Sequence, residues 1–157
     1  MIATADIFDE HAASAAVCEL LLQQFGGVPA FAGSISTVRC HEDNVLLKRC
    51  LSRPGDGGVL VVDGGGSMRF ALLGDHIGTL AVENGWSGIV LNACVRDVDA
   101  IGRLPIGIKA LGAIPRPSSK TGAGEIGVPV AFGGITFNPG AMLYSDDDGI
   151  VVLGQIA

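Results

Sequence analysis

Three charged residues near the middle of the sequence, Asp75, Arg96 and Asp97, have side chains suited to chemistry on a small anion. Arginine presents a planar fork to a carboxylate or an anionic oxygen, and aspartate presents the hard oxygen ligands that Mg²⁺ or Mn²⁺ prefers. The 20 residues between Asp75 and Arg96 suffice for one helix and one strand, which would return the chain to the same sheet edge. We therefore expect the three side chains to converge. The alternative for Arg96 and Asp97 is a simple surface ion pair.

The residues around Asp75 predict the start of a helix. Gly74 permits a sharp entry, Asp75 stands where an N-cap residue would, and Ile77 begins an apolar helical pattern. The first N–H groups of such a helix have no partners inside it and lie at the positive end of its dipole, so they can bind a carboxylate or a phosphate. Residues 74–77 are therefore a candidate anion site. The alternative is an ordinary capped helix in which the Asp75 side chain accepts these N–H bonds itself.

Four other features could carry chemistry, and each also has a structural explanation. His76 follows the predicted N-cap, but a neighbour on a helix can point elsewhere. Lys109 lies in an apolar strand pattern, where it could form a Schiff base, although we expect an edge lysine that points to solvent. Cys94 has no identifiable histidine partner, so we expect it to pack in the core. The acidic run 146–148 suits a metal loop or, more often, a solvated turn.

The glycine run 64–66 directly follows an apolar strand pattern, which invites comparison with phosphate-binding loops. Its spacing fits neither the dinucleotide fingerprint nor the Walker motif, and no Lys-Ser or Lys-Thr pair follows it. We therefore expect a tight turn where two backbone segments pass closely.

The elements that must position these residues form an α/β pattern. The apolar runs 59–63 and 88–95 are typical of strands buried on both faces, and the predicted helix between them would complete a βαβ unit with a site at the carboxyl ends of its strands. Other helices are predicted over 6–22, with Asp6 as a possible N-cap, and over 42–51, where residues 42–44 open a short helix that closes before Pro54. Further strands are predicted over 33–40, 108–111, 128–131, 142–144 and 149–153. We interpret residues 1–157 as one α/β domain.

Composition limits the class of protein. Of 157 residues, 48% are hydrophobic, 17% are charged and 24 are glycine, which excludes disorder. No stretch approaches the ~18 consecutive apolar residues of a membrane-spanning helix. A net charge of −6 without a basic stripe argues against nucleic-acid binding. The four cysteines lack the spacing of a zinc site, and no secretory signal is visible, so we expect buried thiols and a cytoplasmic protein. The scarcity of charge suggests that part of the surface faces another subunit.

Segments from most of the chain resemble a single protein family. They are Phe25-Gly26-Gly27, residues 33–38 (GSISTV), Asp43-Asn44, residues 60–67 (LVVDGGGS), Gly74-Asp75, Arg96-Asp97, residues 133–140 (GGITFNPG) and residues 146–150 (DDDGI). These segments resemble the family of class II 4-hydroxy-4-methyl-2-oxoglutarate aldolases and regulators of ribonuclease E activity A. The resemblance implies a layered α/β/β sandwich of the RraA-like (swivelling-domain) type. It also implies a ring-shaped homotrimer with sites between subunits, and leaves open whether trimers pair into hexamers.

The resemblance implies roles for the residues named at the outset. Aldolase-competent members carry an Asp-x20-Arg-Asp pattern, which is complete here as Asp75, Arg96 and Asp97, whereas ribonuclease regulators tend to lose one or more of these acids. By resemblance, Asp97 would ligate Mg²⁺ or Mn²⁺, and Arg96 would hold the substrate. Residues 74–77 would bind the pyruvyl carboxylate through backbone amides, and Asp75 would orient a metal-bound water. A further acid found in some members is replaced here by Ala100.

The implied reaction is metal-dependent cleavage of 4-hydroxy-4-methyl-2-oxoglutarate into two pyruvates. Oxaloacetate decarboxylation would be a second reaction, because both leave electrons on a pyruvate enolate. A metal chelated by the 2-oxo acid would polarise the ketone, Arg96 would add positive charge near the enolate oxygen, and water steered by Asp75 would accept the hydroxyl proton. The alternative is a non-catalytic protein that binds a ribonuclease. A quinone methyltransferase finds no support, because no nucleotide-fingerprint loop stands at the expected turn.

Overall fold

The central sheet is built from the apolar runs that predict buried strands. Its parallel strands, in order, are β3 (Phe31–Arg39), β4 (Val59–Asp63), β6 (Gly88–Asn92) and β8 (Gly107–Ala110). Alternate side chains face opposite sides, so Leu60 and Val62 belong to one core cluster while Val59 and Val61 belong to another. The sheet is therefore covered on both faces, which is the reason that its strands read as unbroken apolar runs.

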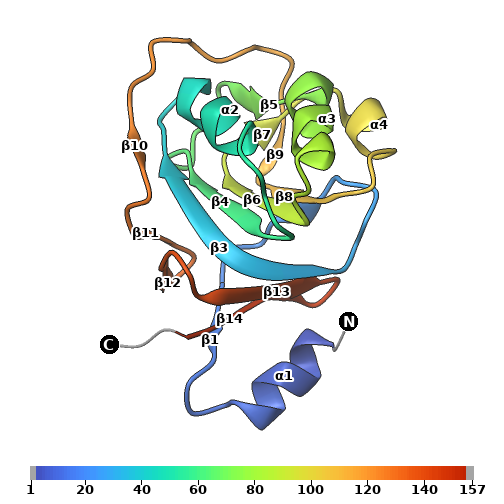
Figure 1. Ribbon diagram of the computed structural model, residues 1–157, viewed down its shortest axis with the longest axis vertical. Coiled ribbons are helices and arrows are strands. Elements are labelled where there is room, and N and C mark those ends of the chain that lie inside the picture. Colours follow the sequence, from blue (N-terminus) through green and yellow to red (C-terminus); the bar gives the residue numbers. More distant parts are fainter. Residues whose placement is uncertain (1–2, 155–157) are drawn as a thin grey trace.

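The computed structural model describes residues 3–154 and shows three layers (Figure 1). Helices α2 (Val45–Leu51) and α3 (Asp75–Glu83) cover one face of the sheet. The sheet continues in the order β1-β14-β13-β3-β4-β6-β8-β2, with the short β1 (Ala16–Val17) and β2 (Gln23–Gln24) at its two ends. It curls, so that β13 (Met142–Asp146) and β14 (Gly149–Leu153) cover the other face beside the hairpin of β11 (Val130–Phe132) and β12 (Ile135–Phe137). This is the single-domain α/β/β sandwich expected from the sequence. No helix within residues 3–154 has the length and apolar character needed to span a membrane.

The N-terminal segment differs from the prediction of a helix over 6–22. Helix α1 (Thr4–Glu10) is short, and Ala3 rather than Asp6 is its N-cap. The chain then forms β1 (Ala16–Val17), which pairs with β14, and β2 (Gln23–Gln24), which pairs with β8. The apolar residues of this segment differ in burial: Cys18 packs in the core, whereas Leu21 is 92% exposed. Pairing with the two sheet edges therefore outweighs a helix propensity that is weak on its own.

The predicted strand over 88–95 is divided between two sheets. After β6 the chain leaves the main sheet at Ala93, and β7 (Cys94–Val95) pairs in parallel with β5 (Ala71–Leu73) and β9 (Gly112–Ala113). The strands β5, β9 and β12 and the four-residue α4 (Val98–Ile101) were not predicted. The small β5-β7-β9 sheet is the part of the fold that carries the candidate site.

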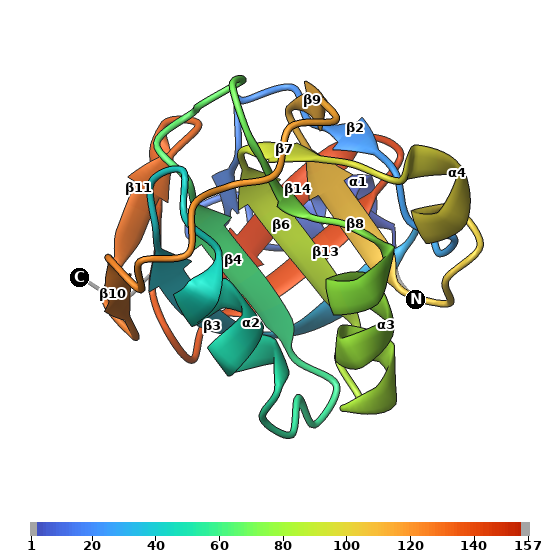
Figure 2. The same cartoon turned by 90° about the horizontal axis from the view of Figure 1, so that it is seen from above.

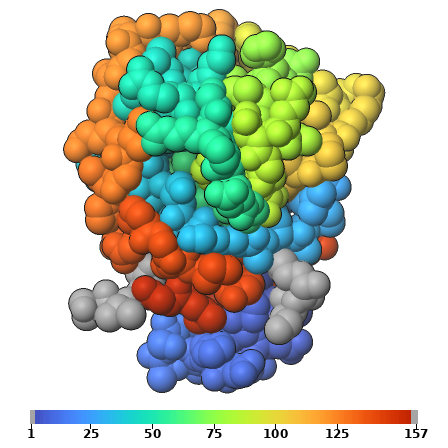
Figure 3. All heavy atoms as spheres, in the orientation of Figure 1, coloured from blue at the N-terminus to red at the C-terminus, as the bar shows by residue number. Residues whose placement is uncertain are grey.

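The segment between β9 and β10 (Glu125–Ile126) runs past the start of α2 (Figure 2). Backbone bonds fix it there, because Ser119 N–H donates to Glu42 O at 3.0 Å and Asn44 N–H donates to Ser119 O at 3.4 Å. The space-filling view shows α2 and α3 as surface neighbours, with this segment on one side and α4 on the other (Figure 3). Residues distant in sequence are thereby gathered around the beginnings of α2 and α3.

Three structural expectations for individual residues are confirmed. The glycine run is a tight turn, in which Gly65 and Gly66 have positive φ and donate their N–H groups to Asp63 Oδ1 at 3.0 Å and to Asn92 O at 3.1 Å. All four cysteines, Cys94 included, are buried and free, and burial raises the pKa of Cys40 to about 12. Of the acidic run 146–148, Asp147 and Asp148 form the exposed turn between β13 and β14, whereas Asp146 ends β13 and its carboxylate accepts hydrogen bonds from Thr4 N–H at 2.8 Å and Oγ1 at 2.6 Å.

Lys109 contradicts the expectation of an edge lysine that points to solvent. Strand β8 lies between β6 and β2, and Lys109 is only 5% exposed. Its ammonium donates to the carbonyl of Asp146 and, at 3.4 Å, to that of Gly149. Burial lowers the pKa of Lys109, while the Asp146 and Asp147 carboxylates oppose that shift. Lys109 therefore ties β8 to the β13–β14 turn, whose carbonyls replace the water that burial removes.

Candidate active site

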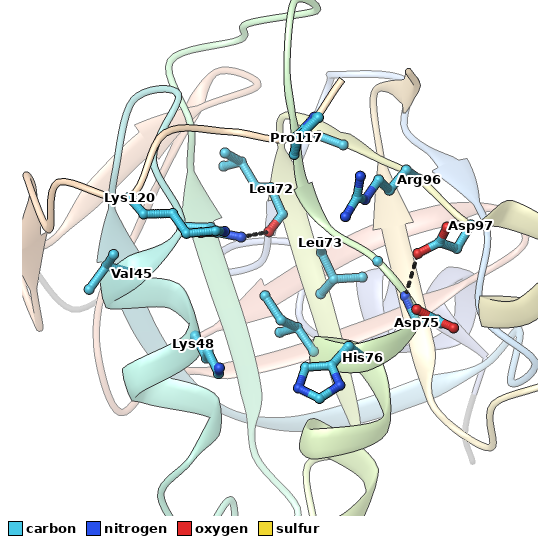
Figure 4. A pocket seen from close by; sticks show the side chains of 14 residues that line it. Val45, Lys48, Leu72, Leu73, Asp75, His76, Arg96, Asp97, Pro117 and Lys120 are labelled. Carbon is cyan, nitrogen blue, oxygen red and sulfur yellow. Dashed lines mark hydrogen bonds between the residues drawn. The ribbon is translucent and has the colours of Figure 1, made fainter. Parts of the chain in front are cut away.

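A cleft of about 390 Å³ lies at the beginnings of α2 and α3 and is closed on one side by the segment after β9 (Figure 4). Every residue that the sequence predicts for the site lines this cleft, namely Gly74, Asp75, His76, Ile77, Arg96 and Asp97. Its volume falls within the range of ~300–1,000 Å³ that is usual for small-molecule sites. The expected convergence of a helix start, a guanidinium and two carboxylates is thus present in the folded chain.

Two adjacent parallel strands bring these residues together. Gly74 follows β5 and Arg96 follows β7, and the two strands are joined at this end by a bond from Arg96 N–H to Leu73 O of 2.9 Å. Parallel strands point their carboxyl ends to the same edge, as the βαβ pattern predicts. The strands concerned are the short β5 and β7, not the long central pair β4 and β6.

Asp97 occupies an unusual backbone conformation and takes the capping role that the sequence assigned to Asp75. Its φ of 57° and ψ of 44° are left-handed, a region that aspartate enters more readily than most residues. Asp97 Oδ2 accepts the Asp75 N–H at 3.0 Å, a bond visible in Figure 4. The N-cap of α3 is Gly74, and the Asp75 side chain forms no cap hydrogen bond. The Asp75 carboxylate is exposed and left available to the cleft.

Gly74 is required for this close approach. A Cβ at position 74 would lie 2.4 Å from Asp97 Oδ2 and 3.3 Å from Arg96 Cγ. The glycine therefore makes room for the Asp97 carboxylate against the start of the helix. Any residue larger than glycine would displace the Asp97 carboxylate or the start of the helix.

Two backbone donors remain in the first turn of α3. Gly78 N–H already bonds to Gly74 O at 2.9 Å, and the Asp75 N–H is used by Asp97. The His76 and Ile77 N–H groups have no acceptor within residues 3–154. Because they stand at the positive end of the helix, they can bind a carboxylate.

Arg96 stands between two hollows of the surface. It lines the main cleft and also a neighbouring cleft of about 400 Å³ bounded by Val98 and Pro115. One guanidinium nitrogen, Nη1, donates to Pro115 O at 3.4 Å, which holds the side chain against the segment after β9. A guanidinium has five N–H donors, so most of them stay free for a ligand. Arg96 and Asp97 are both exposed.

Two lysines and an asparagine in the cleft were missed by sequence reasoning. Lys120 Nζ donates to Asn44 Oδ1 at 3.0 Å, and Asn44 Nδ2 donates to Leu72 O at 3.1 Å. Lys48, one turn into α2, lines the cleft as well. Lys120 lies in a segment without periodicity, so the sequence offered no signal for its position. Lys48 shares a helix face with Val45, but spacing alone could not say what that face meets.

Asp43 fixes the segment that carries Lys120. It is 1% exposed and joins the start of α2 to this segment. Its carboxylate accepts bonds from the Thr121 N–H and Oγ1 (2.9 Å), Ser119 Oγ (3.0 Å), the Gly122 N–H (3.2 Å) and the Val45 N–H (3.2 Å). Burial alone would raise the pKa of Asp43, but the hydrogen bonds from Thr121, Val45 and Ser119 together lower it to about 2. The position of Lys120 therefore depends on a buried, ionised carboxylate.

The donor set suits a hard divalent cation that is only partly held by protein. No group of three or more histidine, cysteine or acidic side chains within residues 3–154 could enclose a metal. Mg²⁺, however, is usually held by one or two carboxylates, with waters and substrate oxygens completing its shell. Asp97 retains Oδ1 after Oδ2 bonds to Asp75, and the Asp75 carboxylate lines the same cleft. These two residues fit such a cation.

Known proteins match the chain along nearly its whole length. The family model for RraA-like proteins, described as Aldolase/RraA, matches residues 4–152. A Geobacillus kaustophilus HTA426 structure, named S-adenosylmethionine: 2-dimethylmenaquinone methyltransferase, is 44% identical with a TM-score of 0.96, and the match covers 99% of this chain and 96% of that one. The RNA-processing inhibitor RraA from Thermus thermophilis is 39% identical with a TM-score of 0.95, covering 100% and 95%. Streptomyces coelicolor RraAS2, an unusual member of the RNase ES inhibitor RraA family, is 25% identical with a TM-score of 0.79, covering 97% and 80%. This chain therefore belongs to the RraA-like family.

Proposed function

We propose that this protein is a divalent-metal-dependent carbon–carbon lyase of short 2-oxo acids. Its reactions would be cleavage of 4-hydroxy-4-methyl-2-oxoglutarate to two pyruvates and decarboxylation of oxaloacetate. The family comprises aldolases as well as ribonuclease inhibitors, so the fold by itself does not choose between them. The observation that carries the proposal is that Arg96, Asp97, Asp75 and the start of α3 line one cleft of about 390 Å³.

The substrate would bind through its 2-oxo acid end. The free N–H groups of His76 and Ile77 receive its carboxylate at the positive end of α3. The Arg96 guanidinium faces the 2-oxo group with its remaining donors. In this orientation the C4 hydroxyl faces Asp75, and the rest of the substrate extends across the cleft.

A divalent cation held by Asp97, with Asp75 beside it, would polarise the 2-oxo group and lower the energy of the charge that develops there. Arg96 stabilises the same developing charge by hydrogen bonds that strengthen as the enolate forms. The Asp75 carboxylate, acting through a water, accepts the proton of the C4 hydroxyl. These three contributions come from exposed groups that share one cleft.

The bond changes balance without any redox partner. In the aldol cleavage the C3–C4 bond breaks, the C4 hydroxyl becomes the ketone of one pyruvate, and the electron pair remains on C3 as an enolate. That enolate takes up the released proton and becomes the second pyruvate. Oxaloacetate gives the same enolate after loss of CO₂, which is why one set of residues can serve both reactions.

Binding to a ribonuclease is the second candidate function. It is favoured by the Thermus thermophilis protein, which is 39% identical and named an RNA-processing inhibitor. Against it stands the complete Asp75, Arg96 and Asp97 set, which the resemblance associates with aldolases. A methyltransferase activity gains no support from the glycine turn, because Gly65 and Gly66 already use their N–H groups on Asp63 and Asn92.

A pyruvate-release assay tests the proposal. Each of the two substrates is supplied with Mg²⁺ and then with a chelator, and pyruvate is measured with a coupled dehydrogenase. We expect release from both substrates that stops on chelation and returns when Mg²⁺ is added back. Turnover that ignores the chelator would rule out the metal role. No turnover with either substrate, together with inhibition of a ribonuclease, would establish the second candidate instead.

A further inference from the structure

The cleft contains two lysines, Lys48 and Lys120, that the reaction above does not use. Lys48 projects from α2 and lines the cleft together with Arg96, which belongs to a different element (Figure 4). Lys48 is exposed, and its ammonium forms no hydrogen bond or ion pair with any residue from 3 to 154. The other lysine of the cleft, Lys120, differs in being bonded to Asn44. Lys48 is therefore a free positive charge at the rim.

The position of Lys48 suits the far end of a dicarboxylate. Figure 4 shows it across the cleft from Arg96 and Asp97, on the α2 side. If the 2-oxo acid end binds at Arg96 and the start of α3, then the rest of the substrate extends toward α2. Both substrates of the proposed function end in a second carboxylate there. A lysine ammonium is a suitable counter-charge, because it is compact and its long stem lets it follow the ligand.

We propose that Lys48 binds the distal carboxylate of the substrate and thereby favours aldol cleavage over decarboxylation. The inference rests on the proposed function and adds a specificity determinant to it. In the aldol cleavage the distal carboxylate remains a carboxylate throughout, since it ends on a pyruvate. Its ion pair with Lys48 is therefore kept in the transition state and contributes to kcat/KM.

In decarboxylation the same ion pair is lost in the transition state. The distal carboxylate of oxaloacetate is the group that leaves, and its negative charge moves into the enolate as CO₂ departs. An ion pair with Lys48 then stabilises the bound substrate but not the transition state. Interactions of this kind lower KM and kcat together and leave kcat/KM unchanged. One residue should thus act differently on the two reactions.

The test compares Lys48→Ala and Lys48→Arg with Arg49→Ala in both reactions at saturating Mg²⁺. Arg49 is the matched control, because it is an exposed cation on the same helix that does not line the cleft. For aldol cleavage we expect Lys48→Ala to lower kcat/KM about tenfold, the loss of one charge-assisted hydrogen bond. For oxaloacetate we expect KM and kcat each to rise about tenfold, with kcat/KM within about twofold of wild type. Lys48→Arg should restore the wild-type ratio of the two kcat/KM values, and Arg49→Ala should leave it unchanged.

A binding measurement separates this inference from the proposed function. Calorimetric titration with 2-oxoglutarate, a dicarboxylate, and 2-oxobutanoate, a monocarboxylate, needs no turnover. Wild type should prefer the dicarboxylate, and Lys48→Ala should lose that preference. Turnover with an unchanged ratio of the two reactions in Lys48→Ala would overturn the inference and leave the proposed function standing. A Lys48-dependent preference for the dicarboxylate without turnover would support Lys48 as a carboxylate-binding residue and contradict the proposed reaction. If neither the preference nor turnover is observed, the inference and the proposed function are both contradicted.

Discussion

Replacing Asp43 by asparagine should destabilise the protein by about 2 kcal/mol at pH 7. Asp43 is buried and accepts bonds from the segment 119–122 and from the start of α2. Its folded-state pKa is about 2, against an ordinary value of 3.8. Each pKa unit corresponds to about 1.36 kcal/mol, so the ionised carboxylate contributes about 2 kcal/mol to the free energy of unfolding.

The contribution should depend on pH in a defined direction. Because folding lowers the pKa of Asp43, the stabilisation is present in full above about pH 4 to 5 and is lost as the pH falls toward about 2. Urea unfolding at pH 7 and at pH 2 should show the difference between wild type and Asp43→Asn shrinking by about 2 kcal/mol. Asp56→Asn is the control, since Asp56 is exposed and its carboxylate accepts no hydrogen bond within residues 3–154.

A second readout reports on the segment itself. Lys120 lies inside the region that Asp43 holds, so loosening this region should speed trypsin cleavage after Lys120. We expect cleavage at that peptide bond to be faster in Asp43→Asn than in wild type or Asp56→Asn. The reasoning would be refuted if Asp43→Asn matched Asp56→Asn in unfolding free energy at pH 7, or if its deficit were the same at both pH values.

Two further outcomes follow from the site and from the composition. Gly74→Ala should lower kcat/KM for pyruvate release, because the alanine Cβ would lie 2.4 Å from Asp97 Oδ2 and displace that carboxylate. Circular dichroism and thermal unfolding should show that the fold is retained, and full activity would contradict the close packing of Gly74 against Asp97. The scarcity of charge and the exposed Leu21 and Met68 favour an oligomer, and the family resemblance implies that it is a homotrimer, with or without pairing to a hexamer. Sedimentation equilibrium should give the mass of three or six chains, and a monomer at micromolar concentration would contradict this expectation.

Local signals in the sequence were sufficient to locate the central strands and the start of α3, but not the small β5-β7-β9 sheet that carries Arg96 and Asp97. The run 59–63 is apolar throughout because β4 is covered on both faces, and a glycine followed by an acid and an apolar pattern marks the start of α3. The 20-residue spacing then placed Asp75 and Arg96 at one sheet edge. These inferences needed only residues close to one another in the chain.

The failures concern contacts between distant segments. The helix predicted over 6–22 gave way to pairing of β1 with β14 and of β2 with β8, partners that a local pattern cannot reveal. Lys109 was expected at the surface because the turn that receives its ammonium lies 37 to 40 residues away. The capping side chain of α3 was predicted to be Asp75, whereas the carboxylate that accepts the Asp75 N–H belongs to Asp97, which follows β6 and β7 in the chain. Lys120 faces the cleft only because the segment after β9 returns to the start of α2, and Lys48 lines it because α2 packs beside α3.

The Mg²⁺ dependence of pyruvate release by wild type and by Asp97→Asn tests the role of Asp97 most directly. Asparagine tolerates the left-handed backbone at position 97, and its amide oxygen can still accept the Asp75 N–H, so the fold should be kept while the charge is lost. Thermal unfolding checks that the two proteins are equally folded. We expect wild-type release to rise with Mg²⁺ and saturate, and Asp97→Asn to show no response to Mg²⁺, with kcat/KM lower by at least about 100-fold. Wild-type rates and an unchanged Mg²⁺ response in Asp97→Asn would contradict the assignment of the cation to Asp97.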